Sequence, residues 1–447
     1  MADNPLVKAL DANWFADHLH DRSMRGIALE TAALIRSGVI EVGTPLPAVR
    51  ELAQALGVSP ATVSAAWGQL RRQKVIAGRG RNGVWVCGDT LSPRPARFEK
   101  IGNFGEHITA DLMLSAPDPA LLPDLRDALL AGLQAENLNS YQREAIAPAL
   151  LAAVKGSWPY AADAFMAADG GFDAMNLTVQ TLLMQGSVVA IEDPTASRLL
   201  DMLDNINAQV LPVKCDEFGP IPESLQLALT KNPSAFIYQP RTHSHCGHAV
   251  NAERFTALAD VLRDSNTLIF EDDGIGQLSH SAPISMGSVL PQRTVHVRSY
   301  SKAYGPDLRL AVISGSNDLI KQIKSFRHFG AGWSSRILQQ ALAYLINDDV
   351  TQQGINHAKT VYAERRKAMS DALKIRGVEV PERDGLAMWI AVPSEQFALV
   401  TLAARGIAVL PGERGRIGPG QFIRISTSQL KPEQIDSIAD AIVLAMG

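Results

Sequence analysis

Residues 295–316 read VHVRSYSKAYGPDLRLAVISGS, in which an apolar run leads into Ser-Tyr-Ser-Lys302 and Arg309 opens a second apolar run. A lysine in this setting is costly to bury unless it is neutralised or used, and a desolvated amine loses its proton readily enough to form a Schiff base. Ser299 and Arg309 can bind an anionic group beside it. The stretch therefore predicts an imine-forming lysine next to an anion site rather than a surface lysine.

Short apolar runs alternate with helical stretches on both sides of this segment. Strands of parallel sheets that are covered on both faces read as short apolar runs, and their connections read as helices. The sequence therefore predicts an α/β fold with a mostly parallel sheet, in which ligands gather at the carboxyl ends of the strands. The predicted strands are residues 187–194, 208–214, 234–240, 266–273, 294–301 and 310–316.

Two further features fall at the ends of apolar runs. Asp272 lies in a Glu-Asp-Asp sequence after one run, where carboxylates can also cap a helix or bind a metal. Gly170 and Gly171 precede a helical stretch, and such a turn offers backbone N–H groups to a phosphate, although it is more often only a turn. A carboxylate, a phosphate-accepting turn and an imine-forming lysine are together what pyridoxal phosphate needs.

The chain has 447 residues, 46% of them hydrophobic, and a formal net charge of −4, which favours a globular protein of two or three domains. Its cysteines, Cys87, Cys215 and Cys246, fit neither a disulfide framework nor a zinc knuckle, so we expect reduced packing residues. No stretch reaches about 18 uninterrupted apolar residues and the N-terminus lacks a signal-peptide core, so we expect a cytoplasmic protein without membrane contact.

Basic residues gather in the N-terminal part of the chain. Residues 1–88 hold ten basic and seven acidic side chains. Between Arg50 and Arg81 the balance sharpens to six basic side chains against Glu51 alone. Such a bias indicates a polyanionic partner for this part.

The same part predicts a DNA-binding arrangement of helices and strands. Helices are predicted at residues 27–40, 48–56 and 60–73, the last with Ser59 as N-cap. Residues 75–88 predict two short strands around a Gly-rich basic tip. A helix-turn-helix places its second helix in the major groove, and a basic wing follows it here. A helical hairpin with solvated arginines is the alternative.

Residues 25–87 resemble the GntR-type winged helix. The resemblance is carried by the segments LPAVRELAQALGVSPATV and, further on, GRGRNGVWV. One position departs from that family, because Pro60 stands where arginine is usual, which removes a donor for phosphate or guanine. The resemblance implies that DNA is the partner of residues 1–88. The residues that it places on DNA are Arg50, Ser59, Thr62, Arg79, Arg81 and Gly83.

Residues 89–107 contain two prolines and mixed charge, which predicts a linker. Residues 108–447 resemble the fold-type I, pyridoxal-phosphate-dependent aminotransferases, whose cofactor-lysine motif is matched by SYSKAYGPDLRLA. The junction of such a domain with a winged helix resembles the MocR-type branch of the GntR transcription regulators.

The aminotransferase resemblance implies a role for each residue of a cofactor site. Lys302 would hold pyridoxal phosphate as the internal aldimine, and Asp272 would pair with the pyridine nitrogen. The phosphate would be bound by Ser299, Arg309 and the backbone N–H groups of Gly171 and Phe172.

Three further residues follow from the resemblance alone. Arg424 sits where the family binds a substrate carboxylate, although an arginine on a surface strand is the alternative. Tyr141 would reach the phosphate bound by the partner subunit, and Ser244 stands at a cofactor-binding asparagine of the family. Family members build this site at a dimer interface, so a homodimer is implied.

Several positions depart from the family inside the implied site. Gly274 and Ile275 replace a tyrosine that bonds the phenolic oxygen of the cofactor, and Ala196 replaces a stacking aromatic. These losses predict altered cofactor electronics and inefficient transamination. The three histidines 243, 245 and 248 lie near Cys246, but their spacing along one loop is irregular, so we expect substitution within a former cofactor loop and no metal.

We therefore expect a dimeric, DNA-binding transcription regulator whose large domain binds pyridoxal phosphate and senses the cofactor itself, an amine or an amino acid. Reaction of the ligand at Lys302 would shift domain closure and move the winged helices. One alternative is a true aminotransferase with an accessory DNA-binding domain. Another is a sensor of some other ligand that uses the same fold without a cofactor.

Overall fold

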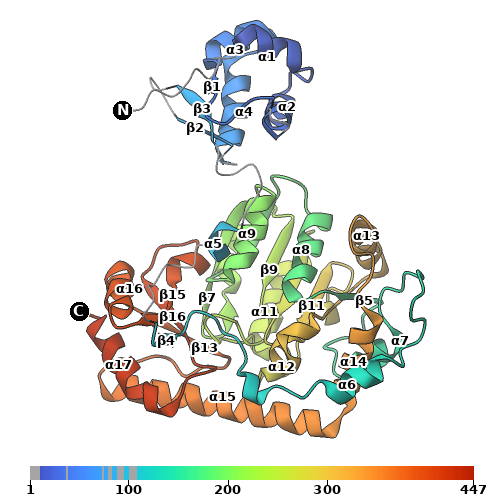
Figure 1. Ribbon diagram of the computed structural model, residues 1–447, viewed down its shortest axis with the longest axis vertical. Helices are drawn as coiled ribbons and strands as arrows, with labels where there is room; N and C mark the ends of the chain where they lie inside the picture. Colours follow the sequence, from blue (N-terminus) through green and yellow to red (C-terminus); the bar gives the residue numbers. More distant parts are fainter. Residues whose placement is uncertain (1–10, 37–38, 73–74, 79–82, 88–94, 100–107) are drawn as a thin grey trace. The chain divides into compact units, whose positions relative to one another are not determined.

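A computed structural model of the protein describes residues 11–36, 39–72, 75–78, 83–87, 95–99 and 108–447. The chain divides into two compact units, Met1–Pro95 and Ala96–Gly447 (Figure 1). Among the helices within the described ranges, none is long and apolar enough to cross a membrane.

The first unit is the predicted winged helix-turn-helix. Its core is formed by large apolar side chains such as Trp67 and Leu52, which are fully buried. A three-stranded antiparallel sheet in the order β1-β3-β2 forms the wing. The described elements are α1 (Ala12–His18), α2 (Met24–Arg36), β1 (Pro45–Leu46), α3 (Val49–Leu56), α4 (Pro60–Arg72), β2 (Ile76–Ala77) and β3 (Val84–Val86).

The turn between α3 and α4 follows from three residues. Gly57 ends α3 with a φ of 69°, a left-handed conformation that glycine adopts without a steric cost. The Ser59 hydroxyl accepts a hydrogen bond from the Thr62 N–H at 3.1 Å, which caps α4. Pro60 occupies the first helical position, where no backbone N–H is needed.

The second unit is built on an eight-stranded sheet in the order β5-β12-β11-β10-β9-β6-β7-β8. The central strands pair in parallel, as predicted. The strands are β5 (Ala164–Ala168), β6 (Val188–Asp193), β7 (Gln209–Asp216), β8 (Gly219–Pro220), β9 (Ala235–Tyr238), β10 (Leu268–Asp273), β11 (Thr294–Ser299) and β12 (Ala311–Gly315).

The sheet is not parallel throughout, since β12 and β8 each run antiparallel to their neighbours. The predicted strand at 310–316 is β12, and it runs antiparallel to β11 and β5. Only a short connection through Lys302 and Arg309 separates β11 from β12, too short for the helical crossover that a parallel pair requires. β5 had no counterpart among the predicted strands.

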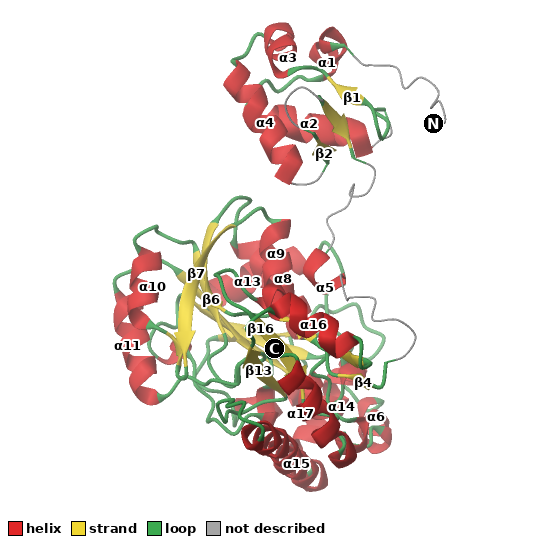
Figure 2. Ribbon diagram, turned by 90° about the vertical axis from the view of Figure 1, so that its left-hand side faces the viewer, coloured by secondary structure: helices red, strands yellow, loops and turns green. Residues whose placement is uncertain are grey.

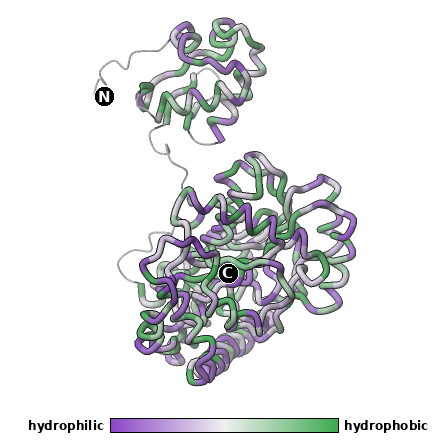
Figure 3. Tube along the Cα trace, turned by 90° about the vertical axis from the view of Figure 1, so that its right-hand side faces the viewer, coloured by the Kyte–Doolittle hydropathy of each residue, from purple (hydrophilic) through white to green (hydrophobic). Residues whose placement is uncertain are grey.

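Helices cover both faces of the sheet, as Figure 2 shows for β6 and β7. Alternate strand residues face opposite sides, so Ile191 belongs to the apolar cluster that includes residues of α8, α9 and α13, whereas Ala190 belongs to the cluster with α10 and α11. Hydrophilic stretches, purple in Figure 3, occur around the periphery of the second unit. The helices are α6 (Arg126–Gly132), α7 (Pro148–Lys155), α8 (Gly171–Leu182), α9 (Ser197–Asn205), α10 (Pro222–Leu229), α11 (Ala252–Arg263), α12 (Ser301–Tyr304), α13 (Asn317–Arg327) and α14 (Arg336–Asn347).

The C-terminal part adds a smaller layer with its own apolar cluster, which includes Ile423 and Ile442. A three-stranded antiparallel sheet, β13-β16-β15, lies beside the parallel pair β14-β4. The elements are β4 (Ala110–Asp111), α15 (Asp349–Ile375), β13 (Ala387–Ala391), α16 (Glu395–Ala403), β14 (Ile407–Ala408), β15 (Leu410–Pro411), β16 (Phe422–Ser426) and α17 (Ile435–Leu444).

A short helix, α5 (Ala96–Glu99), lies inside the segment expected to be a linker. The backbone N–H groups of Arg97 and Phe98 each donate to the Asp201 carboxylate at 3.0 Å. Arg414 donates a hydrogen bond of 2.9 Å to the carbonyl of Arg97. These contacts attach α5 to the second unit, so the attached structure begins earlier than the expected boundary at residue 108.

Candidate functional site

A pocket of about 290 Å³ lies at the carboxyl ends of the parallel strands in the second unit. Tyr141 does not line it, since this side chain is 88% exposed and its ring packs edge-on against Trp333. The other residues expected to bind a cofactor or effector all line the pocket, namely Lys302, Asp272, Ser299, Arg309, Gly171, Phe172, Ser244 and Arg424.

One corner of the pocket is shaped to hold an anion. A β-carbon on Gly171, the first residue of α8, would lie 3.0 Å from Cβ and 3.3 Å from Oγ of Ser299. A β-carbon on Gly170, whose φ is 110°, would lie 3.3 Å from the guanidinium of Arg309. The two glycines therefore let a hydroxyl and a guanidinium approach a helix N-terminus, where backbone N–H groups favour negative charge.

Arg309 adopts a left-handed backbone conformation, with a φ of 47°. This conformation is uncommon for a residue with a β-carbon, and such outliers concentrate at functional sites. The residue ends a short 3-10 turn, Pro306–Leu308, between α12 and β12. The turn aims the guanidinium at the Gly170–Gly171 corner.

Lys302 lies in the single turn of α12, and its ammonium donates to the carbonyl of Ser115. Burial lowers the pKa of Lys302 to about 8, and the positive charge of Arg424 acts in the same direction. A lysine with this pKa has a sizeable neutral fraction near neutral pH, which is the form that attacks a carbonyl.

Asp272, near the end of β10, faces the same pocket. Its Oδ2 accepts a hydrogen bond of 2.6 Å from Nε2 of Gln239. Burial raises the pKa of Asp272 to about 6, although the Gln239 hydrogen bond opposes the shift. A buried carboxylate of this kind is stabilised in its ionised form by a cationic group in the pocket.

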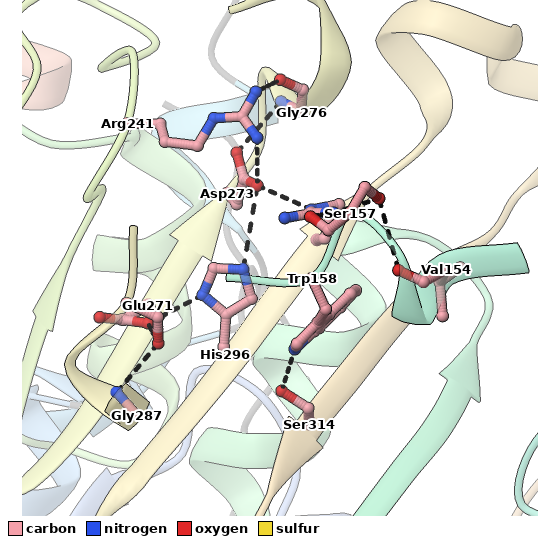
Figure 4. A network of polar contacts seen from close by, with 12 residues as sticks. Val154, Ser157, Trp158, Arg241, Glu271, Asp273, Gly276, Gly287, His296 and Ser314 are labelled. Carbon is pink, nitrogen blue, oxygen red and sulfur yellow. Dashed lines mark hydrogen bonds and ion pairs between the residues drawn. The ribbon is translucent and has the colours of Figure 1, made fainter. Parts of the chain in front are cut away.

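Asp273 faces away from the pocket into a buried polar network, shown in Figure 4. Its carboxylate lies 3.0 Å from Nε of Arg298 and 3.4 Å from a guanidinium nitrogen of Arg241. His296 lies between Asp273 and Glu271. Its Nδ1 is 2.8 Å from Oε2 of Glu271, and its Nε2 is 3.8 Å from Oδ2 of Asp273. Burial favours a raised pKa for Asp273, but the two arginines outweigh it and the pKa is lowered. The network anchors the end of β10 and thereby positions Asp272.

Arg424 lies on β16 and is only 7% exposed, so the alternative of a surface arginine is wrong. One guanidinium nitrogen donates to the carbonyl of Met113, while Nε has no hydrogen-bond partner among the described residues. Burial lowers the pKa of Arg424 to about 10. Nε2 of the neighbouring His245 also lacks a partner within the described chain. Arg424 therefore carries a buried donor, and His245 a buried ring nitrogen, that have no partner among the described residues.

Sequence reasoning missed a second cationic position next to the anion corner. The guanidinium of Arg198, at the start of α9, stacks 4.3 Å from the ring of Phe172 and 4.7 Å from the ring of Phe98. Burial lowers the pKa of Arg198, and repulsion from Arg309 adds to the shift. Phe98 belongs to α5, so a short helix within the segment expected to be a linker supplies one wall of the pocket. Nothing in the local sequence around Phe98 signals this contact.

The positions that depart from the expected pattern also lie in the pocket. Gly274, Ile275 and Ala196 line it, and none of them offers a side-chain hydrogen bond or an aromatic face. A β-carbon on Gly274 would lie 3.3 Å from Oδ1 of Asp272. The pocket thus keeps the residues that could hold a cofactor, but it lacks the hydrogen-bonding and aromatic side chains expected at these three positions.

The candidate DNA-contacting residues belong to the first unit. Arg50 on α3 and Ser59 before α4 are exposed, and Thr62 on α4 is partly exposed. Gly83 precedes β3 with a φ of 74° and has open space around it. Arg79 and Arg81 lie outside the described residues.

Comparison with known proteins gives two family matches. Residues 25–86 match the family described as bacterial regulatory proteins, gntR family. Residues 112–442 match aminotransferase class I and II. The two matches fall within the two units of the structure and cover most of the chain.

Full-length relatives share both parts. The vitamin B6 salvage pathway transcriptional repressor PtsJ of Salmonella typhimurium is 31% identical over 422 residues, spanning 92% of this chain and 96% of the relative. The HTH-type pyridoxine biosynthesis transcriptional regulator PdxR of Corynebacterium glutamicum is 23% identical over 390 residues, spanning 84% and 85%. Among solved structures, a kynurenine aminotransferase of Pyrococcus horikoshii matches with a TM-score of 0.69 at 19% identity, covering 76% of this chain and 91% of its own.

Proposed function

Because the chain belongs to the MocR-type branch of the GntR transcription regulators, we propose that it is a DNA-binding regulator whose pocket holds pyridoxal phosphate on Lys302. The observation that carries the proposal is one pocket that combines Lys302, Asp272 and the corner formed by Gly171, Ser299 and Arg309. The names of PtsJ and PdxR connect those relatives with vitamin B6 and pyridoxine. This supports the cofactor, or a compound like it, as the ligand.

The residues of the pocket fit each part of pyridoxal phosphate. The anion corner suits the phosphate, because a β-carbon on Gly171 would occupy the space between the helix N-terminus and Ser299. Asp272 suits a protonated ring nitrogen, since burial otherwise disfavours its charge. The bound cofactor supplies an aldehyde that captures amines and a ring that accepts electrons.

The protein contributes positions and protonation states. Lys302, with its lowered pKa, presents a neutral amine to the aldehyde carbon. Arg424 adds a guanidinium to the pocket lining, and its Nε has no partner among the described residues, which suits the carboxylate of an amino acid. An amino acid or a related amine is therefore the class of effector that we propose beside the cofactor itself.

The pocket is poorly equipped for efficient transamination. Gly274 and Ile275 provide no hydroxyl for the phenolic oxygen of the ring, and Ala196 provides no aromatic face. The retained residues are those that hold a ligand, and the replaced residues are those that would tune its electronics. We therefore propose a sensor with little or no transaminase activity.

Helix α5 provides a physical route from the pocket toward the DNA-binding unit. Phe98 lines the pocket and stacks on Arg198, next to the anion corner. A phosphate in the corner would draw the Arg198 guanidinium toward Arg309 and away from the Phe98 ring. Because α5 starts the second unit directly after Pro95, a shift of α5 changes the tether of the winged helix. We propose that ligand occupancy acts on DNA affinity through this contact.

Absorption spectra of the purified chain with added pyridoxal phosphate test the proposal. We expect a visible band that borohydride abolishes, with the label mapped to Lys302 by mass spectrometry. Lys302→Ala should lose the label, whereas the matched control Lys321→Ala, an exposed lysine on α13, should keep it. DNA affinity for the upstream region of the gene is then measured by fluorescence anisotropy with and without the cofactor.

Each outcome selects one of the candidate functions. No band with a folded wild-type protein would refute the cofactor and favour a sensor of another ligand. Conversion of amino acids at ordinary turnover rates would favour an aminotransferase. A band on Lys302 with no effect of Arg50→Ala on DNA affinity would contradict the proposed DNA face.

A further inference from the structure

A buried cluster of potential metal ligands lies behind the cofactor pocket. Glu192 comes from the end of β6, Cys215 from β7 and His248 from the loop that follows β9. One ligand atom of each lies within 4.8 Å of the others. His248 also belongs to a second such group with His243 and Cys246. The irregular spacing in the loop argued against a metal, but folding adds two ligands from neighbouring strands.

Two atoms at the centre of this cluster lack any hydrogen-bond partner within the described residues. They are Oε2 of Glu192 and Nε2 of His248, on side chains that are 0% and 2% exposed. They lie 3.7 Å apart, which is too long for a hydrogen bond. Two ligands of one tetrahedral zinc, each about 2.0–2.1 Å from the metal, lie about 3.3 Å apart. The spacing is thus close to that of two atoms sharing a cation.

His243 approaches the other oxygen of the Glu192 carboxylate. Its Nδ1 accepts hydrogen bonds from the backbone N–H groups of His245 and Cys246, both at 3.1 Å. Its Nε2 lies 3.4 Å from Oε1 of Glu192 and has no hydrogen-bond partner among the described residues. The imidazole of His243 therefore faces Oε1, and Oε2 is directed at His248.

A fully buried carboxylate requires a positive partner. Oε1 of Glu192 accepts a hydrogen bond of 2.9 Å from the Gln239 N–H, but Oε2 has none among the described residues. Within the described chain, the groups at ion-pair distance from Glu192 are His243 and His248. Oε2 of Glu192 and Nε2 of His248 are thus two buried polar atoms without partners that a bound cation would satisfy.

We propose that Glu192, Cys215 and His248 bind a zinc-type divalent cation, with Cys246 beside them as a further thiolate. A carboxylate oxygen, an imidazole nitrogen and sulfur form a ligand set that suits Zn²⁺, whereas Mg²⁺ and Ca²⁺ prefer oxygen alone. Binding replaces the thiol protons of Cys215 and Cys246 by metal–sulfur bonds and releases both protons to solvent.

The site would also fix one wall of the cofactor pocket. The loop that carries His248 contains Ser244 and His245, which line that pocket. A metal that ties this loop to β6 and β7 would hold both residues in place. Metal occupancy would therefore act on the pocket without contacting its ligand.

Metal analysis of the full-length protein tests the proposal. After purification without chelator we expect about one zinc per chain by atomic absorption, and Co²⁺ substituted for it should show a thiolate charge-transfer band. His248→Gln and Cys215→Ser should each lose both signals. The matched control Cys87→Ser changes a cysteine of the other unit and should keep them.

Alkylation of the wild-type protein gives a readout that does not depend on the variants. Zn²⁺ should protect Cys215 from iodoacetamide and raise the melting temperature of the chelator-treated protein. The proposal is overturned if folded wild-type protein neither retains zinc nor responds to it. It is equally overturned if the Cys215→Ser, His248→Gln double variant retains the metal.

Discussion

The rate at which pyridoxal phosphate attaches to the protein should level off near pH 8. Only the neutral amine of Lys302 attacks the aldehyde, and burial together with Arg424 lowers the pKa of Lys302 to about 8. The neutral fraction, and with it the attachment rate, should rise about tenfold per pH unit below pH 7 and become constant above about pH 9. An ordinary lysine would continue to gain rate beyond pH 10.

The size of the effect follows from the two pKa values. At pH 7 a lysine with a pKa of about 8 is neutral in about one molecule in ten, whereas one with the usual value is neutral in about one in three thousand. The pocket should therefore accelerate attachment about 300-fold at pH 7 through protonation alone. Positioning by the anion corner adds to this factor and does not depend on the Lys302 pKa.

Stopped-flow absorption between pH 6 and pH 10 measures the rate, with Nα-acetyl-lysine as reference for the titration of the cofactor itself. Arg424→Gln removes the positive neighbour, so the Lys302 pKa should rise and the rate at pH 7 should fall by about 2- to 10-fold. Desolvation is the larger cause of the shift and remains in this variant. A rate that rises in parallel with the reference through pH 9.5 would show that Lys302 has an ordinary pKa and refute the reasoning.

Three further changes test the other parts of the pocket. Asp272 has a raised pKa of about 6, so the affinity for the cofactor should fall as the pH drops through 6. In equilibrium titrations, Asp272→Asn should abolish this pH dependence and weaken binding about 10- to 100-fold at pH 7.5. Gly171→Ala places a β-carbon 3.0 Å from Cβ of Ser299 and should lower the affinity for the cofactor about tenfold. The control Gly156→Ala, where the added β-carbon meets open space, should leave the affinity unchanged. Equal affinities of the two variants would contradict the anion corner. Asp201→Ala removes the acceptor of two α5 N–H groups and should uncouple DNA affinity from the cofactor in anisotropy assays, whereas Asp204→Ala removes only an exposed ion pair with Arg97 and should preserve the coupling.

The cofactor corner of the site could be predicted because its chemistry is concentrated in one short segment. Ser299, Lys302 and Arg309 fall between two apolar runs, so adjacency in sequence already implies adjacency in space. Asp272 and Gly171 follow other apolar runs, and the carboxyl ends of parallel strands meet at one edge of a sheet. The apolar runs thus bring these residues to attention, and the resemblance to the aminotransferases assigns them to one site.

Other parts of the site could not be predicted because they depend on contacts between distant segments. Arg198 reaches the pocket only because α9 packs beside α8, and Phe98 reaches it only because Asp201 holds α5. The resemblance singles out Arg424, but its local sequence leaves a surface arginine open, and only burial in the sheet β13-β16-β15 excludes that alternative. β5 was missed because AFMAA has neither alternation nor β-branched residues.

The balance between retained and replaced residues decides what the pocket can do. A ligand shifts a conformational equilibrium only by the difference between its affinities for the two states. Holding a ligand requires the anion corner, Asp272 and Lys302, all of which line the pocket, whereas turnover also requires groups that Gly274 and Ala196 do not supply. Under the proposed coupling, the difference in affinity arises at Arg198, whose guanidinium stacks on the Phe98 ring of α5 and is repelled by Arg309 of the anion corner. A phosphate bound in that corner would compete with Phe98 for Arg198, so the charge that holds the proposed cofactor would also act on α5, where the second unit begins.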